Sequence, residues 1–170
     1  MELASLWTCL VLAGSLCLAS GDDSTQGDER SQGLADLSFP DPRPLFLTPW
    51  IKNCSYDVAK NKSKLEIFQP LGVNANAYSG YITVKNGTNN LFFIFIEAEN
   101  NDAKAPLMLW TPGGPGLPVL LSLLLQNGPV QFDAQGNLTR RELTIQKNMS
   151  VIYLDAPVGA GYSFTTNESG

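Results

Sequence analysis

The sequence of 170 residues contains no histidine, and that absence excludes much of the chemistry that a chain of this size can perform. A Ser-His-Asp triad, a Cys-His pair and every zinc site with an imidazole ligand need at least one histidine. Neither G-x-G-x-x-G nor G-x-x-x-x-G-K-[ST] occurs, which argues against a nucleotide cofactor. We therefore expect no metal, no cofactor and no complete triad from these residues alone.

Charge is also scarce, because Asp, Glu, Lys and Arg make up only 16% of the chain. The 11 basic and 16 acidic residues give a net charge of −5, which leaves no basic footprint for nucleic acid or an anionic membrane surface. Apolar residues reach 44%, an ordinary value for a globular chain and too high for wholesale disorder. The length suits one domain of roughly 100–200 residues.

Long apolar runs are rare, and the most extended one lies at the start of the chain. Leu6–Leu18 is apolar apart from three residues, and small side chains follow it before the first acidic pair. The run is too short for the ~20 residues that a helix needs to cross a bilayer. It predicts a signal peptide over residues 1–21, cleaved after Gly21, although Glu2 stands where Lys or Arg is usual. We expect no membrane span in the mature chain.

Cysteine is nearly absent once the predicted signal is removed, because only Cys54 remains. A single cysteine in an oxidising compartment forms a disulfide with another chain, stays free, or has lost its partner. The sequence leaves these three possibilities open.

Sequons for N-glycosylation, in contrast, are more frequent than the composition gives by chance, which favours a glycoprotein of the secretory pathway. Six are present, at Asn53, Asn61, Asn86, Asn137, Asn148 and Asn167.

Composition divides the mature chain into two parts. Residues 22–44 are polar, acidic and spaced by prolines, which predicts a flexible N-terminal arm or propeptide. Residues 45–170 carry the apolar patterns of a folded domain. Within it, Leu45–Ile51 is an apolar patch that we expect to pack on the domain, and Asp57–Phe68 has weak helical spacing.

The clearest patterns inside this domain are strands, followed by one helix. A hairpin is predicted from two β-branched and aromatic runs around an Asn-Gly turn, and two later apolar runs suit strands buried on both faces. The predicted elements are the hairpin strands Ser79–Val84 and Leu91–Ile96, the turn 85–90, the buried strands Ala105–Trp110 and Ser150–Leu154, and the helix Leu117–Gln126. Antiparallel strands followed by strand, loop, helix and strand are typical of an α/β sheet with a hairpin edge.

A glycine-rich loop, Gly113-Gly114-Pro115-Gly116, directly follows one predicted strand and precedes the helix. Without a nucleotide motif, two interpretations of this loop remain. It forms an oxyanion hole, in which glycines allow the backbone N–H groups to approach the substrate, or it is only a tight turn that needs left-handed conformers.

The residues around this loop resemble those of the serine carboxypeptidases. Leu109–Gly116 is similar to the strand-to-loop signature of that family, and Tyr153–Phe164 matches its second signature, D-x-P-V-G-x-G-[FY]-S-[FY], at every fixed position. Ser79–Val84 resembles the opening hairpin, and Pro44–Pro49 is similar to the vitellogenic-like branch. The resemblance extends from Pro44 to Phe164.

The resemblance implies an α/β-hydrolase fold, here incomplete, with the opening hairpin, the third and fourth strands and the first helix. Members remove C-terminal residues from peptides with a Ser-Asp-His triad, outside the cell or in lysosomes. No G-x-S-x-G nucleophile elbow is present, and Ser163 in Gly161-Tyr162-Ser163 is not followed by the required glycine. We therefore expect the N-terminal part of a serine carboxypeptidase, with no catalytic triad residue in this chain and with peptides as the substrates of the whole enzyme.

By the same resemblance, the N–H of Gly114 is an oxyanion donor and Gly113 lies beside it, near the terminal carboxylate of the substrate. The other signature residues are expected to build the wall of the site; they are Trp110, Pro115, Gly116, Asp155, Pro157, Gly159 and Gly161. Two departures weaken substrate recognition. Pro112 stands where the family has Asn or Gln, and Leu117-Pro118-Val119 replaces a residue and a serine pair.

Three interpretations therefore stay open. The first is the N-terminal part of a serine carboxypeptidase. The second is a non-catalytic secreted paralogue or binding glycoprotein on the same scaffold. The third is an unrelated, β-rich secreted interaction protein. None predicts an oligomeric state.

Overall fold

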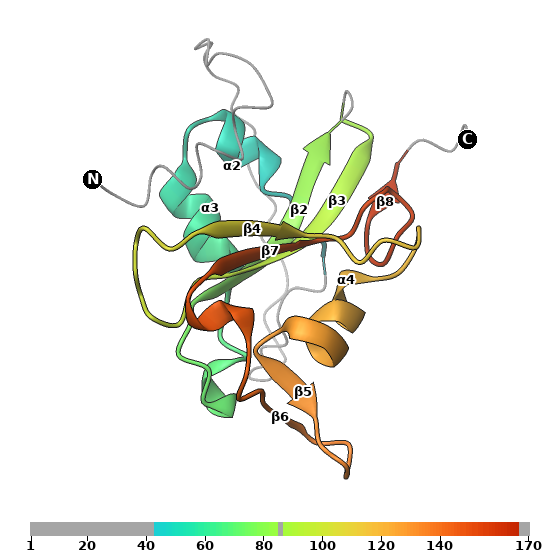
Figure 1. Ribbon diagram of the computed structural model, residues 1–170. Coiled ribbons are helices and arrows are strands. Elements are labelled where there is room, and N and C mark those ends of the chain that lie inside the picture. Colours follow the sequence, from blue (N-terminus) through green and yellow to red (C-terminus); the bar gives the residue numbers. More distant parts are fainter. Residues whose placement is uncertain (1–42, 85–86, 167–170) are drawn as a thin grey trace, which may run out of the picture.

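The computed structural model describes residues 43–84 and 87–166 and has a mixed α/β fold (Figure 1). Its central sheet has the strand order β1-β2-β3-β7-β4, and β8 pairs with β3 outside this path. The strands are β1 (Lys64–Leu65), β2 (Ala77–Val84), β3 (Asn89–Ile96), β4 (Leu107–Trp110), β7 (Ser150–Leu154) and β8 (Phe164–Thr165). A separate two-stranded ribbon pairs β5 (Val130–Phe132) with β6 (Leu138–Arg140).

The predicted hairpin is confirmed, with β2 and β3 paired antiparallel from Ala77↔Ile96 to Val84↔Asn89. β3 pairs antiparallel with β7, and β7 pairs parallel with β4. Because Trp110 lies opposite Tyr153 in the parallel pair, β4 and β7 end side by side.

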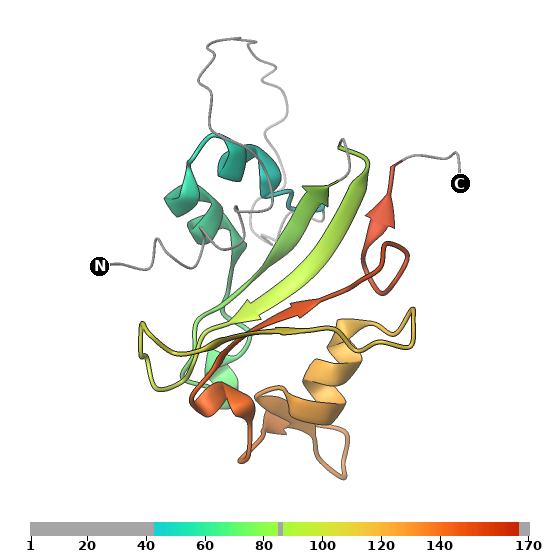
Figure 2. The ribbon, with the colours of Figure 1, turned by 45° about the horizontal axis from the view of Figure 1, so that its top comes forward.

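Helices cover both faces of the sheet (Figure 2). One face carries α2 (Thr48–Lys52) and α3 (Tyr56–Ser63), where Leu47, Ala59, Phe93 and Ile152 form a core. The other face carries α4 (Val119–Leu121), which continues without a break into the π-helix η2 (Ser122–Asn127). Two short 3₁₀ helices complete the fold, η1 (Gln69–Leu71) and η3 (Ile145–Lys147).

The second core, beneath α4 and η2, is the larger of the two. Val119 and Leu123 from the helix pack with Val130 of β5 against apolar side chains of the sheet. The predicted burial of Ser150–Leu154 is confirmed, because Val151 and Tyr153 face this core while Ile152 faces the other.

The predicted strand over Ala105–Trp110 is present from Leu107, but the expectation that both of its faces are buried is wrong. Met108 and Trp110 pack against the core under α4, whereas Leu109 on the opposite face is 61% exposed. β4 is the last strand at this edge of the described sheet. It contributes no residue to the core between the sheet and helices α2 and α3.

The helix predicted over Asp57–Phe68 ends at Ser63, five residues early. Lys64 is extended and pairs with Tyr78, and Leu65 pairs with Ala77. These two residues therefore form β1 of the sheet and are not part of the helix. A weak helical period cannot compete with such a pairing, because helical stability comes mainly from tertiary packing.

The apolar patch Leu45–Ile51 packs on the sheet as predicted. Leu47 is fully buried and donates its N–H to the Tyr81 carbonyl, 2.9 Å away, while the Tyr81 N–H donates to the Leu45 carbonyl. The predicted signal peptide, nearly all of the arm and the sequons at Asn86 and Asn167 lie outside the described residues. None of the helices in residues 43–84 and 87–166 is long and apolar enough to cross a membrane.

Candidate functional site

Two loops leave the sheet where β4 and β7 end. The glycine-rich loop begins after Trp110, and the second signature begins after Leu154. Because the two strands are parallel neighbours, both loops lie at one end of the sheet, with the start of α4 behind them (Figure 1). Ligands of α/β sheets bind outside the carboxyl ends of the strands, so this end is the place to look for a site.

The glycine-rich loop is open and depends on its glycines. Gly113, Gly114 and Gly116 have φ angles of 77°, 104° and 102°, which L side chains rarely adopt. Within the described residues, no backbone hydrogen bond uses the N–H of Gly113 or Gly114, and both residues are exposed. Two adjacent, unpaired N–H groups on an exposed loop can bind an anion or a developing oxyanion.

Asp155 joins the two loops. Its side chain is fully buried, with Oδ1 accepting from the N–H of Val119 at 2.5 Å and Oδ2 accepting from the N–H of Tyr162 at 2.8 Å. Val119 begins the helix that follows the glycine-rich loop, where a carboxylate complements the helix dipole. The carboxylate thereby fixes the distance between the helix start and the second loop.

The second loop is tightly held. Gly161 has a φ of 53°, and a Cβ there would lie 2.1 Å from Oδ2 of Asp155, so only glycine fits. Ser163 is buried; its Oγ donates to the Asp155 carbonyl at 2.7 Å and accepts from the Phe92 N–H at 2.8 Å. This hydroxyl is committed to holding the loop, which agrees with the expectation that Ser163 is not the nucleophile.

The far end of the helix is also fixed by polar contacts. Arg141 donates from Nε to the Gly128 carbonyl and from Nη2 to the Leu124 carbonyl, both at 2.9 Å. Inside, the Tyr153 hydroxyl donates to Oδ1 of Asn127 at 3.1 Å, and burial raises the pKa of Tyr153 to about 12. The helix behind the glycine-rich loop is therefore held at both ends.

Two polar atoms near this helix are buried without a partner among the described residues. They are Nε1 of Trp110, directly before the glycine-rich loop, and Oγ of Ser122 in the π-helix. The Trp110 indole N–H is thus a buried donor without an acceptor among these residues, on a side chain that packs against the core beneath α4. Sequence patterns identified Trp110 but gave no signal for Ser122 or for Arg141.

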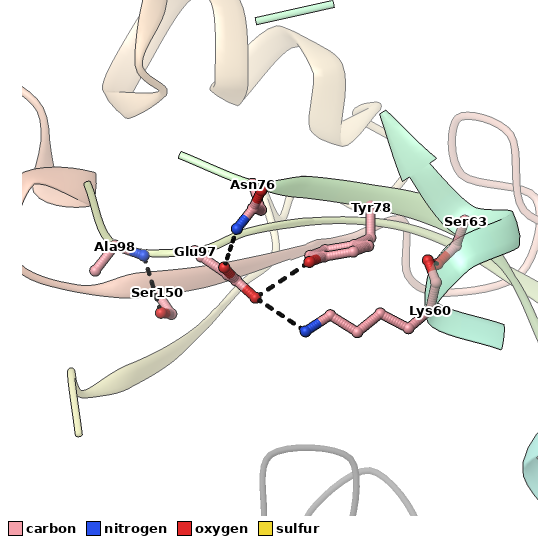
Figure 3. Close-up of polar contacts among 7 residues, drawn as sticks. All are labelled: Lys60, Ser63, Asn76, Tyr78, Glu97, Ala98 and Ser150. Atoms are coloured by element: carbon pink, nitrogen blue, oxygen red, sulfur yellow. Dashed lines mark hydrogen bonds and ion pairs between the residues drawn. The ribbon is translucent and has the colours of Figure 1, made fainter. Parts of the chain in front are cut away.

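A second polar cluster lies on Glu97, just after β3 (Figure 3). The Glu97 carboxylate accepts from Nδ2 of Asn76 at 2.8 Å and from the Tyr78 hydroxyl at 3.3 Å, and Nζ of Lys60 lies 3.8 Å from Oε1. Both carboxylate oxygens are therefore occupied. β3 is antiparallel to β7, so this cluster is at the other end of the sheet and ties α3 to it.

The structure brings together the glycine-rich loop and the Asp155–Ser163 segment, because β4 and β7 are neighbours and Asp155 binds the N–H groups of Val119 and Tyr162. The described sequon asparagines, Asn53, Asn61, Asn137 and Asn148, are all exposed and lie on other elements. Pro157 follows a cis peptide bond and closes a turn in which its carbonyl accepts from the Ala160 N–H at 3.0 Å.

Comparison with known proteins identifies the family that uses this arrangement. The sequence model of the serine carboxypeptidases matches residues 67–170, more than half of the chain. The chain belongs to the serine carboxypeptidase family. Both loops lie within the part of the chain that the family model matches.

Relatives of this serine carboxypeptidase chain include insect enzymes. It is 38% identical over 128 residues to the vitellogenic carboxypeptidase of Aedes aegypti and 41% identical over 129 residues to the venom serine carboxypeptidase of Apis mellifera. In both cases the match covers 75% of this chain and 27% of the relative. The chain thus spans about a quarter of the length of the curated relatives it matches.

A solved structure agrees on the fold. The crystal structure of Kex1(Δ)p, a prohormone-processing carboxypeptidase from Saccharomyces cerevisiae, aligns with a TM-score of 0.54 and 21% sequence identity. The alignment covers 65% of this chain and 26% of that protein. The fold is therefore that of the α/β-hydrolases, as expected from the sequence.

Proposed function

We propose that this chain forms the oxyanion side of a serine carboxypeptidase site, which hydrolyses the last peptide bond of a peptide. The observation that carries the proposal is the pair of unpaired N–H groups on Gly113 and Gly114 at the carboxyl end of β4. Gly114 donates to the oxyanion of the tetrahedral intermediate, and Gly113 lies toward the substrate carboxylate. In other hydrolases, loss of one such donor lowers the rate by about 10²–10³.

The remaining signature residues support this loop in the proposal. Trp110, Pro115 and Gly116 shape it, and Asp155, Pro157, Gly159 and Gly161 form the neighbouring wall. Asp155 positions the helix start rather than touching the substrate, because both of its oxygens accept from backbone N–H groups.

The nucleophile, acid and histidine come, in this proposal, from sequence outside the 170 residues, because these contain no histidine. The chain alone is then inactive. The sequence features argue for export, with residues 1–21 as signal, 22–44 as arm or propeptide, 45–170 as part of the hydrolase domain, and glycans on the sequons. The names of the relatives, vitellogenic and venom, favour the secretory pathway, and we propose an extracellular or lysosomal destination within it.

A graft tests the proposal. Residues 43–166 replace the matching segment of the Aedes aegypti enzyme, and release of the C-terminal amino acid from an N-acylated dipeptide is measured. We expect turnover by the graft and none by the 170-residue chain. Pro112→Asn in the graft restores a side-chain amide and should raise kcat/KM roughly tenfold, the value of one hydrogen bond. Turnover by the 170-residue chain itself would refute the proposal.

One observation favours the second candidate function, a non-catalytic binding glycoprotein. Pro112 has neither a side-chain amide nor a backbone N–H at the position where the family holds the substrate carboxylate. If the graft folds but is inactive with either residue at position 112, while the unmodified Aedes enzyme is active, the scaffold has lost catalysis and the binding function is preferred.

A further inference from the structure

Arg140 and Arg141 are the only two basic residues that are adjacent in the sequence. They stand at the end of β6, and the next two residues are exposed, Leu143 to 85% of its surface. An arginine pair followed by an exposed segment matches what an endoprotease with two neighbouring acidic pockets can bind, because each pocket takes one guanidinium group. Nothing in the proposed oxyanion site uses this pair.

In the folded chain, both guanidinium groups are already bound. Arg140 donates from Nη1 to the Gly72 carbonyl at 2.8 Å and from Nη2 to Oε2 of Glu99 at 2.6 Å. The Glu99 side chain is only 8% exposed whereas that of Arg140 is 38% exposed, so the carboxylate is shielded from water and the guanidinium group is partly open to it. Arg141 is held by the carbonyls at the end of the π-helix, and its N–H donates to the Pro129 carbonyl at 2.8 Å. A protease cannot bind either side chain without first removing it from these partners.

The element that carries the pair is one of the less stable parts of the fold. β5 and β6 form a ribbon of two short strands apart from the main sheet, and Phe132 and Leu138, which face each other across it, are 49% and 36% exposed. Two-stranded ribbons are marginally stable by themselves, and such units open locally before the whole protein unfolds. Together with Val130, which is buried in the core beneath α4, the contacts of the two arginines hold the ribbon to the rest of the chain.

We propose that the Arg141–Glu142 peptide bond is a latent processing site for an endoprotease specific for paired basic residues, closed by the folded ribbon. When β6 opens, the two guanidinium groups enter the acidic pockets and the bond is hydrolysed. Water adds its hydroxyl to the Arg141 carbonyl carbon and a proton to the Glu142 nitrogen. The cut breaks the covalent link between the ribbon and the segment that carries η3 and β7.

Glu99→Gln tests the proposal, because it removes one charge from the Glu99–Arg140 pair and leaves both arginines in place. Trypsin, which binds a single Arg or Lys, is added to the full chain in native buffer, and the products are identified by mass. Cleavage after Arg141 is compared with cleavage after Lys104, an exposed residue in the β3–β4 loop. Wild type should be cut after Lys104 long before Arg141. In Glu99→Gln, cleavage after Arg141 should rise about tenfold, because a charged hydrogen bond is lost and cleavage follows the open population.

Glu66→Gln is the matched control, because Glu66 pairs with Lys64 at 3.8 Å on the surface, and it should leave cleavage after Arg141 unchanged. Arg141→Lys is the second variant; it stays a trypsin site but cannot reach two carbonyls at once, so its cleavage should also rise. A subtilisin-like protease specific for paired basic residues should cut Glu99→Gln once, after Arg141. Equal cleavage of wild type and Glu99→Gln after Arg141 would overturn the proposal, and so would a parallel rise after Lys60 inside α3, which indicates global unfolding.

Discussion

The two loops at the end of β4 and β7 are neighbours in space but differ in how they are held. The loop over Gly113–Gly116 has open space around two of its glycines and leaves two N–H groups unpaired. The segment from Asp155 to Ser163 is held by the buried carboxylate, the buried hydroxyl and three backbone hydrogen bonds, from Gly159, Ala160 and Ser163. One loop offers donors, whereas the other uses the N–H of Tyr162 and the hydroxyl of Ser163 to hold itself in place.

The difference explains where this chain departs from the family signatures. The second signature is matched at every fixed position, and at Gly161 the space beside the Asp155 carboxylate leaves no room for a side chain. Three of the departures, Pro112, Leu117 and Pro118, lie in or beside the open loop, whereas the fourth, Val119, is fully buried in the core beneath α4. The supporting loop is thus constrained by internal contacts, while the presenting loop makes few of them.

Removing the Asp155 carboxylate should have the largest effect on stability. Asp155→Ala leaves the N–H groups of Val119 and Tyr162 buried without an acceptor, at about 1–3 kcal/mol each, and we expect a loss of about 4 kcal/mol in the free energy of unfolding. Urea unfolding followed by circular dichroism measures it. Asp155→Asn keeps one acceptor oxygen and should lose about half as much. A loss under 1 kcal/mol for Asp155→Ala would mean that the two loops are not joined through this residue.

Gly161→Ala should follow, with a loss of about 3 kcal/mol, because its Cβ would overlap Oδ2 of Asp155 and Gly161 has a positive φ. The steric part of this loss in the free energy of unfolding arises from overlap with the Asp155 carboxylate, so it should disappear when that carboxylate is removed. In the Asp155→Ala background, Gly161→Ala should therefore cost only about 1 kcal/mol, the backbone strain alone. Urea unfolding of the four proteins of this double-mutant cycle gives the coupling energy. Strict additivity of the two changes would contradict the contact.

The sequence predicted the larger elements and the two loops, but not the contacts that hold them. Strand periods and the Asn-Gly turn located β2 and β3, and the signatures located Gly113 and Asp155. The exposure of Leu109 on one face of β4 was missed, because an apolar run looks the same in a strand covered on both faces and in a strand with one covered face. β1 and the β5–β6 ribbon were missed because they are too short to show a period. The Arg141 contacts join positions far apart in sequence, which no local pattern encodes.

Ser163→Ala tests the anchored loop at its other end and should have an intermediate effect. It removes the acceptor of the Phe92 N–H and the donor to the Asp155 carbonyl, and we expect a loss of about 2 kcal/mol. Ser163→Thr keeps the hydroxyl but adds a methyl group to a buried site, so it is not a suitable control. Ser55→Ala is the control instead. The Ser55 hydroxyl makes only an exposed contact of 3.5 Å, and its removal should change stability by less than about 0.5 kcal/mol. A Ser163→Ala protein as stable as Ser55→Ala would show that the hydroxyl does not hold the loop.

The open loop should respond least to a similar change. Gly116→Ala places a Cβ where nothing lies within 4 Å, so only the strain of φ at 102° remains, about 1 kcal/mol. Gly136 in the β5–β6 turn has the same properties, with φ at 83° and no neighbour within 4 Å, and Gly136→Ala is the matched control. Urea unfolding should give equal losses for the two variants, because neither glycine supports a contact. A loss for Gly116→Ala as large as that for Gly161→Ala would mean that the glycine-rich loop is packed after all, and the contrast between a presenting and a supporting loop would fail.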